Sequence, residues 1–416
     1  MIFTQLTEQE YTLFEINHPY GSFMQSIEAY QWKKRGGNEC FLVGIKEGEQ
    51  IVAATFLFSI PVAKVFKYFY APRGFLIDYS QKEILRFFIE ELTKFLKSKK
   101  GLYLKFDPYV LYAQRDAQAN RVEGGFNHQY VLDHLKQLGC YHGGFTVGVN
   151  GISQARWMMT MDIQNKSEKD ILKNMRTLTR RSIKKTEKLG IQVRELDIDE
   201  MDLFMDMLES TGKRCNFAVR ERSFYVEQAK AFKNHCKVLV AYMDVDAYLA
   251  KIDEDKQMSS KKLEDILKRL EQDSTNEKNL NKKIANEKAI EVAKKKREEA
   301  LLLKEKYGSK INMASGYFIN QGQECVYISG ASYEEFMKYD AQYAIQWYMI
   351  QDSIQNHLKR YNFYGQTGDF SETSEDYGVY EFKKGFGGIV EELVGDFVLP
   401  IRKNWFRLYN SIKHIV

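Results

Sequence analysis

The sequence has few prolines and no clustered cysteines. Only 5 of its 416 residues are proline, which favours long regular elements over an extended proline-rich chain. The five cysteines lie far apart and form no C-x-x-C pair, so neither a disulfide framework nor a structural zinc site is expected. This cysteine usage is typical of a protein in the reducing cytosol.

Long apolar runs are also missing. The longest apolar stretch, residues 51–66, contains Thr55, Ser59, Pro61 and Lys64 and falls short of the ~20 residues that a membrane span requires. We expect it to form two buried strands around a turn at the proline. The first ten residues, MIFTQLTEQE, lack the basic and apolar regions of a signal peptide, so none is expected. The prediction is a cytoplasmic protein without a transmembrane segment, and peripheral contact with the inner membrane face is left open.

An excess of charge of one sign is missing as well. Lys and Arg total 61 against 56 Asp and Glu, so the net charge is only +5 and any polyanion-binding surface must be local. Hydrophobic residues make up 44% of the chain and aromatic residues 14%, which excludes a disordered protein. At roughly 100–200 residues per domain, the length predicts two or three packed domains.

One segment, residues 250–306, contains no aromatic residue, no glycine and no proline. Apolar residues recur at helical spacing on both sides of a polar break at residues 273–276. This pattern predicts two helices folded back on each other as an antiparallel hairpin, with arms of very roughly 30–40 Å. The mixed charges of the hairpin are as typical of a solvated spacer as of a partner-binding arm.

Strand and helix patterns alternate on both sides of this hairpin. The expected strands are residues 39–45, 51–60, 64–70, 102–106, 157–161, 191–195, 237–242, 312–319 and 325–328. The expected helices are residues 81–97, 167–189 and 201–212. Because a similar order of elements begins again after residue 151, we predict an α+β fold of two tandem mixed domains, the second interrupted by the hairpin.

The predicted helix 167–189 concentrates positive charge. Lysines and arginines cover most of its polar surface and outnumber the acidic residues there. Such a face can contact a phosphate backbone or anionic headgroups, and a solubilising surface helix has the same pattern. Because the whole chain is nearly neutral, we favour a binding role for this helix.

Common enzyme motifs are missing too. There is no P-loop, no G-x-S-x-G and no H-E-x-x-H, which argues against P-loop enzymes, serine hydrolases and zinc proteases. The Gln/Arg-x-x-Gly-x-Gly/Ala turn with which acetyltransferases hold coenzyme A is also missing, since the nearest segment, residues 382–387, lacks the leading residue. We therefore expect no coenzyme A donor and no other cofactor.

An ordered set of motifs resembles the FemABX family, the tRNA-dependent aminoacyltransferases that build the interpeptide bridges of peptidoglycan. The motifs are GSFMQS (21–26), YAPRG (70–74), YLKFDP (103–108), YAIQW (343–347), RYNFYG (360–365), YEFKKGFGG (380–388) and LVGDF (393–397). The resemblance covers essentially the whole chain. It includes the hairpin, which is similar to that of the FemA and FemB branch and is missing from the shorter FemX type.

The resemblance implies a fold, a reaction and partners. It implies two tandem acetyltransferase-like domains, residues 1–150 with 380–416 and residues 151–379, with the hairpin 250–306 inserted in the second. It implies a cleft for a muropeptide precursor that is linked to UDP or to a lipid. The reaction would transfer glycine, alanine or serine from aminoacyl-tRNA to the stem-peptide lysine or to a growing bridge.

The resemblance also assigns roles to single residues. Lys383 matches a lysine that would stabilise the negative charge developing on the ester carbonyl, and Phe382 beside it would shape the cleft wall. Lys33 and Arg220 match residues that contact the diphosphate of the precursor, which suits two cations on different elements. Asp107 would orient the attacking amine or bind the stem peptide, although an aspartate that caps a turn has the same pattern.

Further residues are candidates for substrate and tRNA contacts. Further substrate-binding candidates are Arg73, Phe224 and Tyr327, and the expected tRNA contacts on the basic helix are Arg176, Arg180, Arg181 and Lys184. The chain departs from the family pattern where Tyr-Ile-Ser-Gly at residues 327–330 replaces the usual Tyr-x-Tyr-x-Gly. Two other functions stay open at this stage: a coenzyme A-dependent N-acyltransferase, and a non-catalytic tRNA-binding or scaffold protein whose hairpin does the binding.

Overall fold

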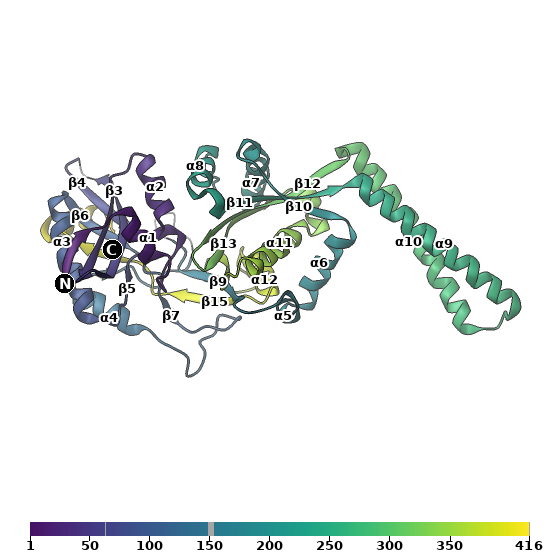
Figure 1. Cartoon of the computed structure of the whole chain (residues 1–416), viewed down its shortest axis with the longest axis horizontal. Helices are drawn as coiled ribbons and strands as arrows, with labels where there is room; N and C mark the ends of the chain where they lie inside the picture. Colours follow the sequence, from purple (N-terminus) through teal and green to yellow (C-terminus); the bar gives the residue numbers. More distant parts are fainter. Residues whose placement is uncertain (63, 149–153, 416) are drawn as a thin grey trace.

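The computed structural model describes residues 1–62, 64–148 and 154–415. These residues form two mixed sheets of eight strands each, and a helical hairpin projects from one end of the body (Figure 1). The predicted α+β fold class and the predicted helical hairpin are confirmed.

The first sheet has the strand order β1-β2-β3-β4-β6-β16-β8, and β5 pairs with β3. Its strands are β1 (Ile2–Gln5), β2 (Cys40–Glu47), β3 (Gln50–Val62), β4 (Phe66–Ala71), β5 (Leu76–Ile77), β6 (Gly101–Phe106), β8 (Tyr141–His142) and β16 (Phe397–Pro400). The accompanying helices are α1 (Glu8–Glu15), α2 (Ile27–Arg35), α3 (Lys82–Ser98), α4 (Gln129–Gln137) and α13 (Lys403–Lys413). The amphipathic helix α3 buries Leu85, Phe88 and Leu92 in the core of this part.

β3 is longer than the sequence predicted. It continues through Pro61 and pairs with β4 as far as the contact between Val62 and Phe66, so the expected turn at the proline is wrong. On its other side the pairing with β2 ends at Phe58, opposite Cys40. Proline has no N–H to donate, and it is tolerated here because the strand has a partner on one side only.

The second sheet has the strand order β10-β11-β12-β13-β14-β9-β15-β7. Its strands are β7 (Leu111–Ala113), β9 (Trp157–Asp162), β10 (Ile191–Glu195), β11 (Cys236–Asp244), β12 (Lys310–Gln321), β13 (Glu324–Ser332), β14 (Arg360–Gln366) and β15 (Ile389–Leu393). The accompanying helices are α5 (Glu168–Asn174), α6 (Thr177–Lys188), α7 (Met201–Cys215), α8 (Arg222–Phe232), α11 (Ala341–Gln355) and α12 (Tyr377–Gly385). Short 3-10 helices span Phe23–Gln25, Ile198–Glu200, Lys233–His235 and Glu334–Tyr339.

The two sheets exchange chain segments. β7, which comes early in the chain, pairs with β15 at the edge of the second sheet. The chain then crosses back, and β16 enters the first sheet between β6 and β8. The C-terminal segment that was assigned to the first domain thus places β15 in the second sheet and β16 in the first, and the division into domains stays a prediction.

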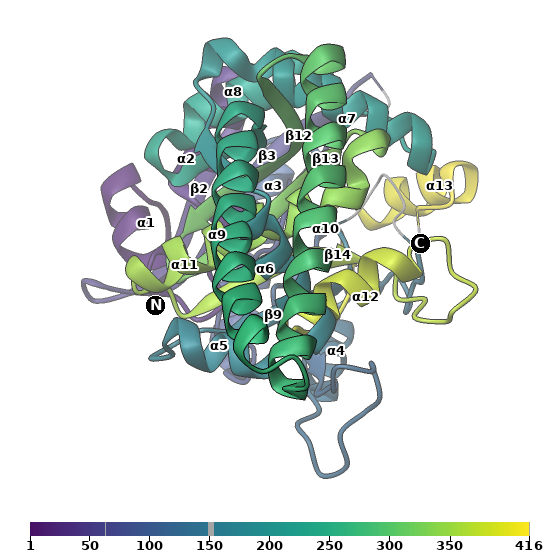
Figure 2. The same cartoon turned by 90° about the vertical axis from the view of Figure 1, so that its right-hand side faces the viewer.

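The helical hairpin consists of α9 (Val245–Gln272) and α10 (Glu277–Tyr307), which lie side by side in Figure 2. It stands where a turn would join β11 to β12, because Asp244 at the end of β11 pairs with Lys310 at the start of β12. Near its base Tyr248, Ile252 and Ala300 are buried in the core of the second sheet. The hairpin is therefore an insertion at one strand connection and not a link between distant parts of the fold.

The predicted single helix 167–189 is wrong, because the chain breaks into α5 and α6. Met175 and Arg176 adopt extended backbone conformations, with ψ of 150° and 149°. The Arg176 N–H donates to the carbonyl of Gly385 on α12, which ties the break to that helix. A β-carbon on Gly385 would lie 2.4 Å from the Thr179 hydroxyl oxygen, so the glycine permits the close packing of α6 on α12.

Candidate active site

Asp107 and Arg73 form a buried ion pair where the first sheet meets the second. Asp107 follows the end of β6, and Arg73 lies in the turn after β4 with a φ of 55°. Asp107 Oδ2 lies 3.3 Å from Arg73 Nη1, and each residue is 2% exposed. Arg73 Nη2 donates to the carbonyl of Ala155, just before β9, at 2.7 Å. The pair thus connects strand ends of the first sheet to the second sheet.

The two oxygens of the Asp107 carboxyl have different surroundings. Oδ1 accepts hydrogen bonds from the Tyr70 hydroxyl at 2.9 Å and from the Arg73 backbone N–H at 3.3 Å. Oδ2 is buried and accepts no hydrogen bond from any described residue, apart from its ion-pair contact. Burial raises the pKa of this carboxyl to about 6 and the Arg73 charge opposes the rise, so the group is mainly ionised at neutral pH.

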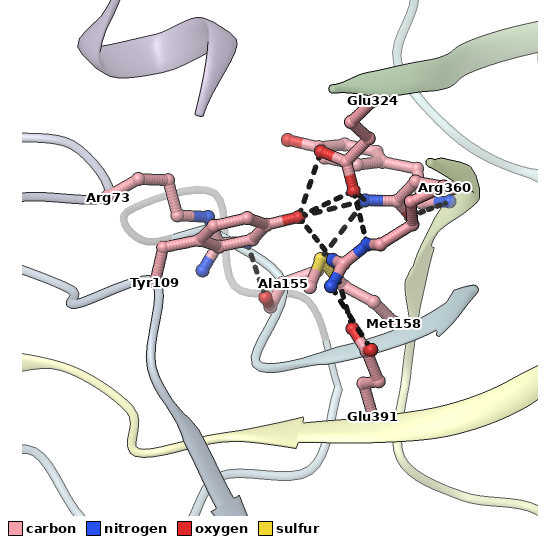
Figure 3. Close-up of polar contacts among 9 residues, drawn as sticks. Arg73, Tyr109, Ala155, Met158, Glu324, Arg360 and Glu391 are labelled. Carbon is pink, nitrogen blue, oxygen red and sulfur yellow. Dashed lines mark hydrogen bonds and ion pairs between the residues drawn. The ribbon is translucent and has the colours of Figure 1, made fainter. Parts of the chain in front are cut away.

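A network of buried and half-buried charges anchors this region to the second sheet (Figure 3). The Tyr109 hydroxyl accepts a hydrogen bond from Arg360 Nη2 at 2.7 Å and donates to Glu324 at 3.0 Å. Arg360 also pairs with Glu324 at 2.7 Å and with Glu391 at 3.0 Å. The Arg73 guanidinium lies 5.6 Å from the centre of the Tyr109 ring. Each of these charges has a partner, and the Tyr109 ring links Arg73 to the network and so to β13, β14 and β15.

Tyr364 on β14 makes polar contacts at both of its ends, one toward Asp107 and one toward Lys383. The Tyr70 hydroxyl that donates to Asp107 accepts from Gln154 Nε2 at 3.4 Å, and Gln154 Oε1 accepts from the Tyr364 hydroxyl at 3.3 Å. The main-chain carbonyl of Tyr364 in turn lies 3.5 Å from Lys383 Nζ. The hydroxyl and the carbonyl lie at opposite ends of Tyr364, so this residue lies between the Asp107 group and Lys383, and the two candidates are not in direct contact.

Lys383 lies on α12 with its amine buried. The residue is 5% exposed, and Nζ donates to the carbonyl of Gly365 on β14 at 2.7 Å. Burial lowers the pKa of this amine to about 7, and Asp376 opposes the shift. Both the ammonium and the neutral amine are therefore populated near neutral pH. The charged form can stabilise a developing oxyanion, and the neutral form can accept a proton.

Phe382 lies in an aromatic cluster beside Lys383. Its ring is 4.9 Å from the ring of Tyr343 on α11 and 5.3 Å from that of Phe386, in edge-to-face contacts. The residue is half-buried. These contacts fix the orientation of the ring and, with it, the end of α12 that carries Lys383.

Lys33 and Arg220 approach each other across aromatic side chains. The Arg220 guanidinium lies 4.6 Å from the centre of the Phe224 ring, which contacts the Trp32 ring at 5.1 Å. The Lys33 amine lies 4.4 Å from the centre of the Trp32 ring. Burial and the charge of Arg220 both lower the pKa of Lys33. Neither cation pairs with a carboxylate of the residues that the structure describes, so both are available to an anion.

Tyr327 lies on β13 next to an irregularity in its pairing with β12. Its hydroxyl accepts a hydrogen bond from Gln342 at 2.6 Å, and its ring stacks on Phe318 at 5.1 Å. Burial raises its pKa well above the usual range. These contacts attach Tyr327 to α11 and β12 and do not join it to Asp107 or Lys383.

Two of the four expected tRNA contacts are engaged within the protein. Arg180 Nη1 donates to the carbonyl of Met175 at 2.6 Å and also reaches the last carbonyls of α5, so it caps that helix. Arg176 pairs with Glu381 on α12. Arg181 and Lys184 on α6 are exposed and pair with no carboxylate in the described part of the chain.

Sequence reasoning missed most of the supporting residues. Those missed are Tyr70, Tyr109, Gln154, Glu324, Arg360, Tyr364 and Glu391. One signal was present in β14, where Arg360 and Asn362 alternate with the buried aromatic residues Tyr361 and Phe363. Alternation along a strand places the two polar side chains on one face, and their burial then requires partners.

The described residues contain no group of three or more His, Cys, Asp or Glu side chains placed to hold a metal ion. Nor does any described helix combine the length and the apolar character that crossing a bilayer would need. What the fold does present is an ionised carboxylate paired with an arginine at the sheet junction, and a buried amine on α12. This combination suits a reaction in which an amine is positioned and negative charge develops on a carbonyl oxygen.

Comparisons with known proteins agree over the full length of the chain. Residues 6–414 match the model of the FemAB family. The chain is 38% identical over 416 residues to the aminoacyltransferase FemA of Staphylococcus epidermidis, covering 100% of both proteins. It is 36% identical to the aminoacyltransferase FemA of Staphylococcus aureus, covering 100% of this chain and 99% of that one. A crystal structure of FemX matches with a TM-score of 0.84 at 23% identity, covering 98% of this chain and 99% of FemX, so the two share a fold.

Proposed function

Because the chain belongs to the FemAB family, we propose that it is an aminoacyltransferase that extends peptidoglycan interpeptide bridges. The donor is an aminoacyl-tRNA carrying glycine, alanine or serine. The acceptor is the stem-peptide lysine or a bridge already begun, on a precursor linked to UDP or to a lipid. The observation that carries the proposal is the buried amine of Lys383, which donates to the Gly365 carbonyl on β14 and has a pKa of about 7.

The geometry suggests a role for Asp107 and for Lys383. The acceptor amine donates a hydrogen bond to Asp107 Oδ2, which pairs with Arg73 but accepts no hydrogen bond within the described residues, and the amine is thereby aimed at the ester. The amine nitrogen bonds to the ester carbonyl carbon, and the charged Lys383 amine stabilises the oxyanion that forms. The bond from that carbon to the ribose oxygen then breaks, and the proton lost by the amine passes to this oxygen. The products are an amide and deacylated tRNA.

The cations near α2 and α8 support binding of the precursor. Lys33 and Arg220 face each other without a carboxylate partner, and their mutual repulsion falls when an anion lies between them. A diphosphate carries the charge and the acceptor oxygens that suit such a pair. The Phe224 and Trp32 rings beside them keep the cations on the wall of the site.

The basic helix α6 supports binding of tRNA. α6 packs on α12, the helix that carries Lys383, through the close contact between Thr179 and Gly385. A tRNA backbone held by the exposed Arg181 and Lys184 therefore lies close to the helix that carries the proposed oxyanion-stabilising amine. The structure of α6 supports these two residues better than Arg176 and Arg180, which have partners within the protein.

We place the reaction in the cytoplasm, at the inner face of the membrane when the acceptor is lipid-linked. An assay of the purified protein tests the proposed reaction. Glycyl-, alanyl- and seryl-tRNA with labelled amino acids are each offered with UDP-linked and with lipid-linked precursor, and label in the precursor is measured. We expect transfer from at least one charged tRNA and none from the matching acyl-coenzyme A. Transfer from coenzyme A alone, or from neither donor, contradicts the proposal.

A further inference from the structure

The C-terminal helix α13 exposes an apolar stripe to solvent. Its inner side packs on the first sheet, where Phe406 is buried and its ring lies 5.5 Å from that of Tyr103 on β6. On another side Trp405, Leu408 and Ile412 are 57%, 56% and 66% exposed. Their spacing of three and four residues places them on one face of the helix. Figure 2 shows α13 at the edge of the body.

A neighbouring turn enlarges this surface. The Phe66 ring, at the start of β4, lies 5.8 Å from the Trp405 ring, so the turn between β3 and β4 lies next to α13. Val65 in this turn is also exposed. We call Val65, Phe66, Trp405, Leu408 and Ile412 the α13 patch.

Positive charge surrounds the α13 patch. Lys403, Arg407 and Lys413 are exposed on α13 and pair with no carboxylate among the described residues, and Lys64 is exposed in the adjoining turn. The last acidic residue of the sequence is Asp396, so α13 carries none. Glu39, just before β2, pairs with Lys67 on the neighbouring β4 at 2.9 Å, so its charge is balanced.

We infer that the α13 patch docks the protein on the surface of an anionic phospholipid bilayer. Exposed Trp, Leu and Ile side chains can enter the boundary between headgroups and acyl chains, while lysine and arginine at the rim bind anionic headgroups. A second copy of the chain is a poorer partner, because a two-fold interface through this surface brings the same cations together. This inference rests on the part of the proposed function that places the reaction at the membrane, and it names the surface that makes the contact.

Vesicle sedimentation with the full-length protein tests this inference without tRNA or acceptor. Phosphatidylcholine vesicles are compared with vesicles that also contain phosphatidylglycerol. We expect binding to the anionic vesicles at least roughly tenfold tighter than to the neutral ones, and a similar loss in a Trp405→Ser, Leu408→Ser, Ile412→Ser variant. The matched control, Ile284→Ser with Leu302→Ser, removes exposed apolar side chains of the hairpin and retains binding.

Two further measurements distinguish membrane docking by the α13 patch from binding elsewhere on the protein and from self-association. Trp405 is exposed whereas Trp157 and Trp347 are buried, so we expect anionic vesicles to shift the fluorescence to shorter wavelength in the wild type and much less in Trp405→Phe. Sedimentation velocity reports self-association. Equal vesicle binding by the wild type and the triple serine variant overturns the inference. So does a wild-type dimer that is lost in the triple serine variant, because the α13 patch would then bind a second copy of the chain. Because no transfer is measured, either result leaves the proposed reaction intact.

Discussion

At the scale of single residues, Lys383 acts in the proposed reaction as a charged amine, but burying that charge destabilises the folded protein. Its amine has a pKa of about 7 in the folded protein against an ordinary 10.5, because burial disfavours the ammonium. Between these values the unfolded chain binds a proton that the folded chain has lost, so stability rises with pH across this window. Below it both states are protonated, and the full cost of burying the charge remains.

Replacing Lys383 by methionine is therefore expected to stabilise the protein, and more so in acid. The melting temperature of Lys383→Met should exceed that of the wild type by more at about pH 6 than at about pH 10, since only the wild type carries the pH-dependent cost. Thermal unfolding followed by circular dichroism measures both differences. The same change at the exposed Lys262 should give no such pH dependence. A variant that is less stable in acid than in base, relative to the wild type, contradicts the burial of this charge.

The Asp107 and Arg73 pair gives the opposite expectation for stability. Asp107→Asn keeps the shape of the side chain but leaves the Arg73 guanidinium buried without a carboxylate, which should cost about 3–5 kcal/mol of unfolding free energy. Denaturant unfolding measures this loss. Asp253→Asn, at an exposed ion pair with Arg297 on the hairpin, is the matched control and should change little. An equal loss of unfolding free energy in the two variants would show that the ion pair of Asp107 and Arg73 contributes no more to stability than an exposed one.

At the scale of elements, α6 carries the prediction about tRNA. The double variant Arg181→Glu, Lys184→Glu should weaken tRNA binding. It should also reduce the slope of the logarithm of the binding constant against the logarithm of the salt concentration by an amount equal to about two phosphate contacts. Filter binding over a range of salt concentrations measures both. The same charge change at Lys261 and Lys262 on the hairpin controls for net charge. Loss of binding in the hairpin variant alone would favour the scaffold alternative, in which the hairpin binds tRNA.

Arg176 and Arg180, which this variant leaves unchanged, show that a charge pattern does not reveal which basic side chains have partners within the protein. The sequence predicted positive charge along 167–189 correctly, but it treated Arg180 as a surface cation. In the fold Arg180 turns back onto the carbonyls that end α5, because the chain breaks at Met175 and leaves those carbonyls without helical partners. The break depends on α12, which is about 200 residues away, so local periodicity does not reveal it.

At the scale of the whole molecule, the hairpin can be separated from the fold. Because Asp244 and Lys310 already pair in adjacent strands, the rest of the sheet does not depend on the length of this connection. Deleting residues 259–291 and joining the ends by a short glycine turn keeps the buried Tyr248, Ile252 and Ala300. We expect this variant to unfold in one cooperative transition and to bind tRNA with wild-type affinity. A variant that folds but no longer binds tRNA would assign the binding to the hairpin.

Much of the secondary structure could be predicted from the sequence, but the contacts where the two sheets meet could not. Most strands, the helix at 81–97 and the hairpin have periodic patterns that reflect local burial. The hydrogen bonds that join Asp107, Tyr70, Gln154 and Tyr364 connect residues 37, 84 and 210 positions apart in the sequence. Only the family resemblance related Lys383 to Asp107, since no spacing in the chain indicates how β14 and α12 lie relative to the end of β6.

The most direct test of the central claim is single-turnover transfer by Lys383→Met, measured with labelled aminoacyl-tRNA bound to the enzyme and saturating precursor. The matched control is Lys384→Met, which changes the adjacent lysine, whose amine pairs with Glu381 instead of with β14. We predict that the rate falls by about 100-fold or more in Lys383→Met, while tRNA affinity and the rate of Lys384→Met stay near those of the wild type. Equal rates in the two variants would contradict a role for the buried amine in the reaction.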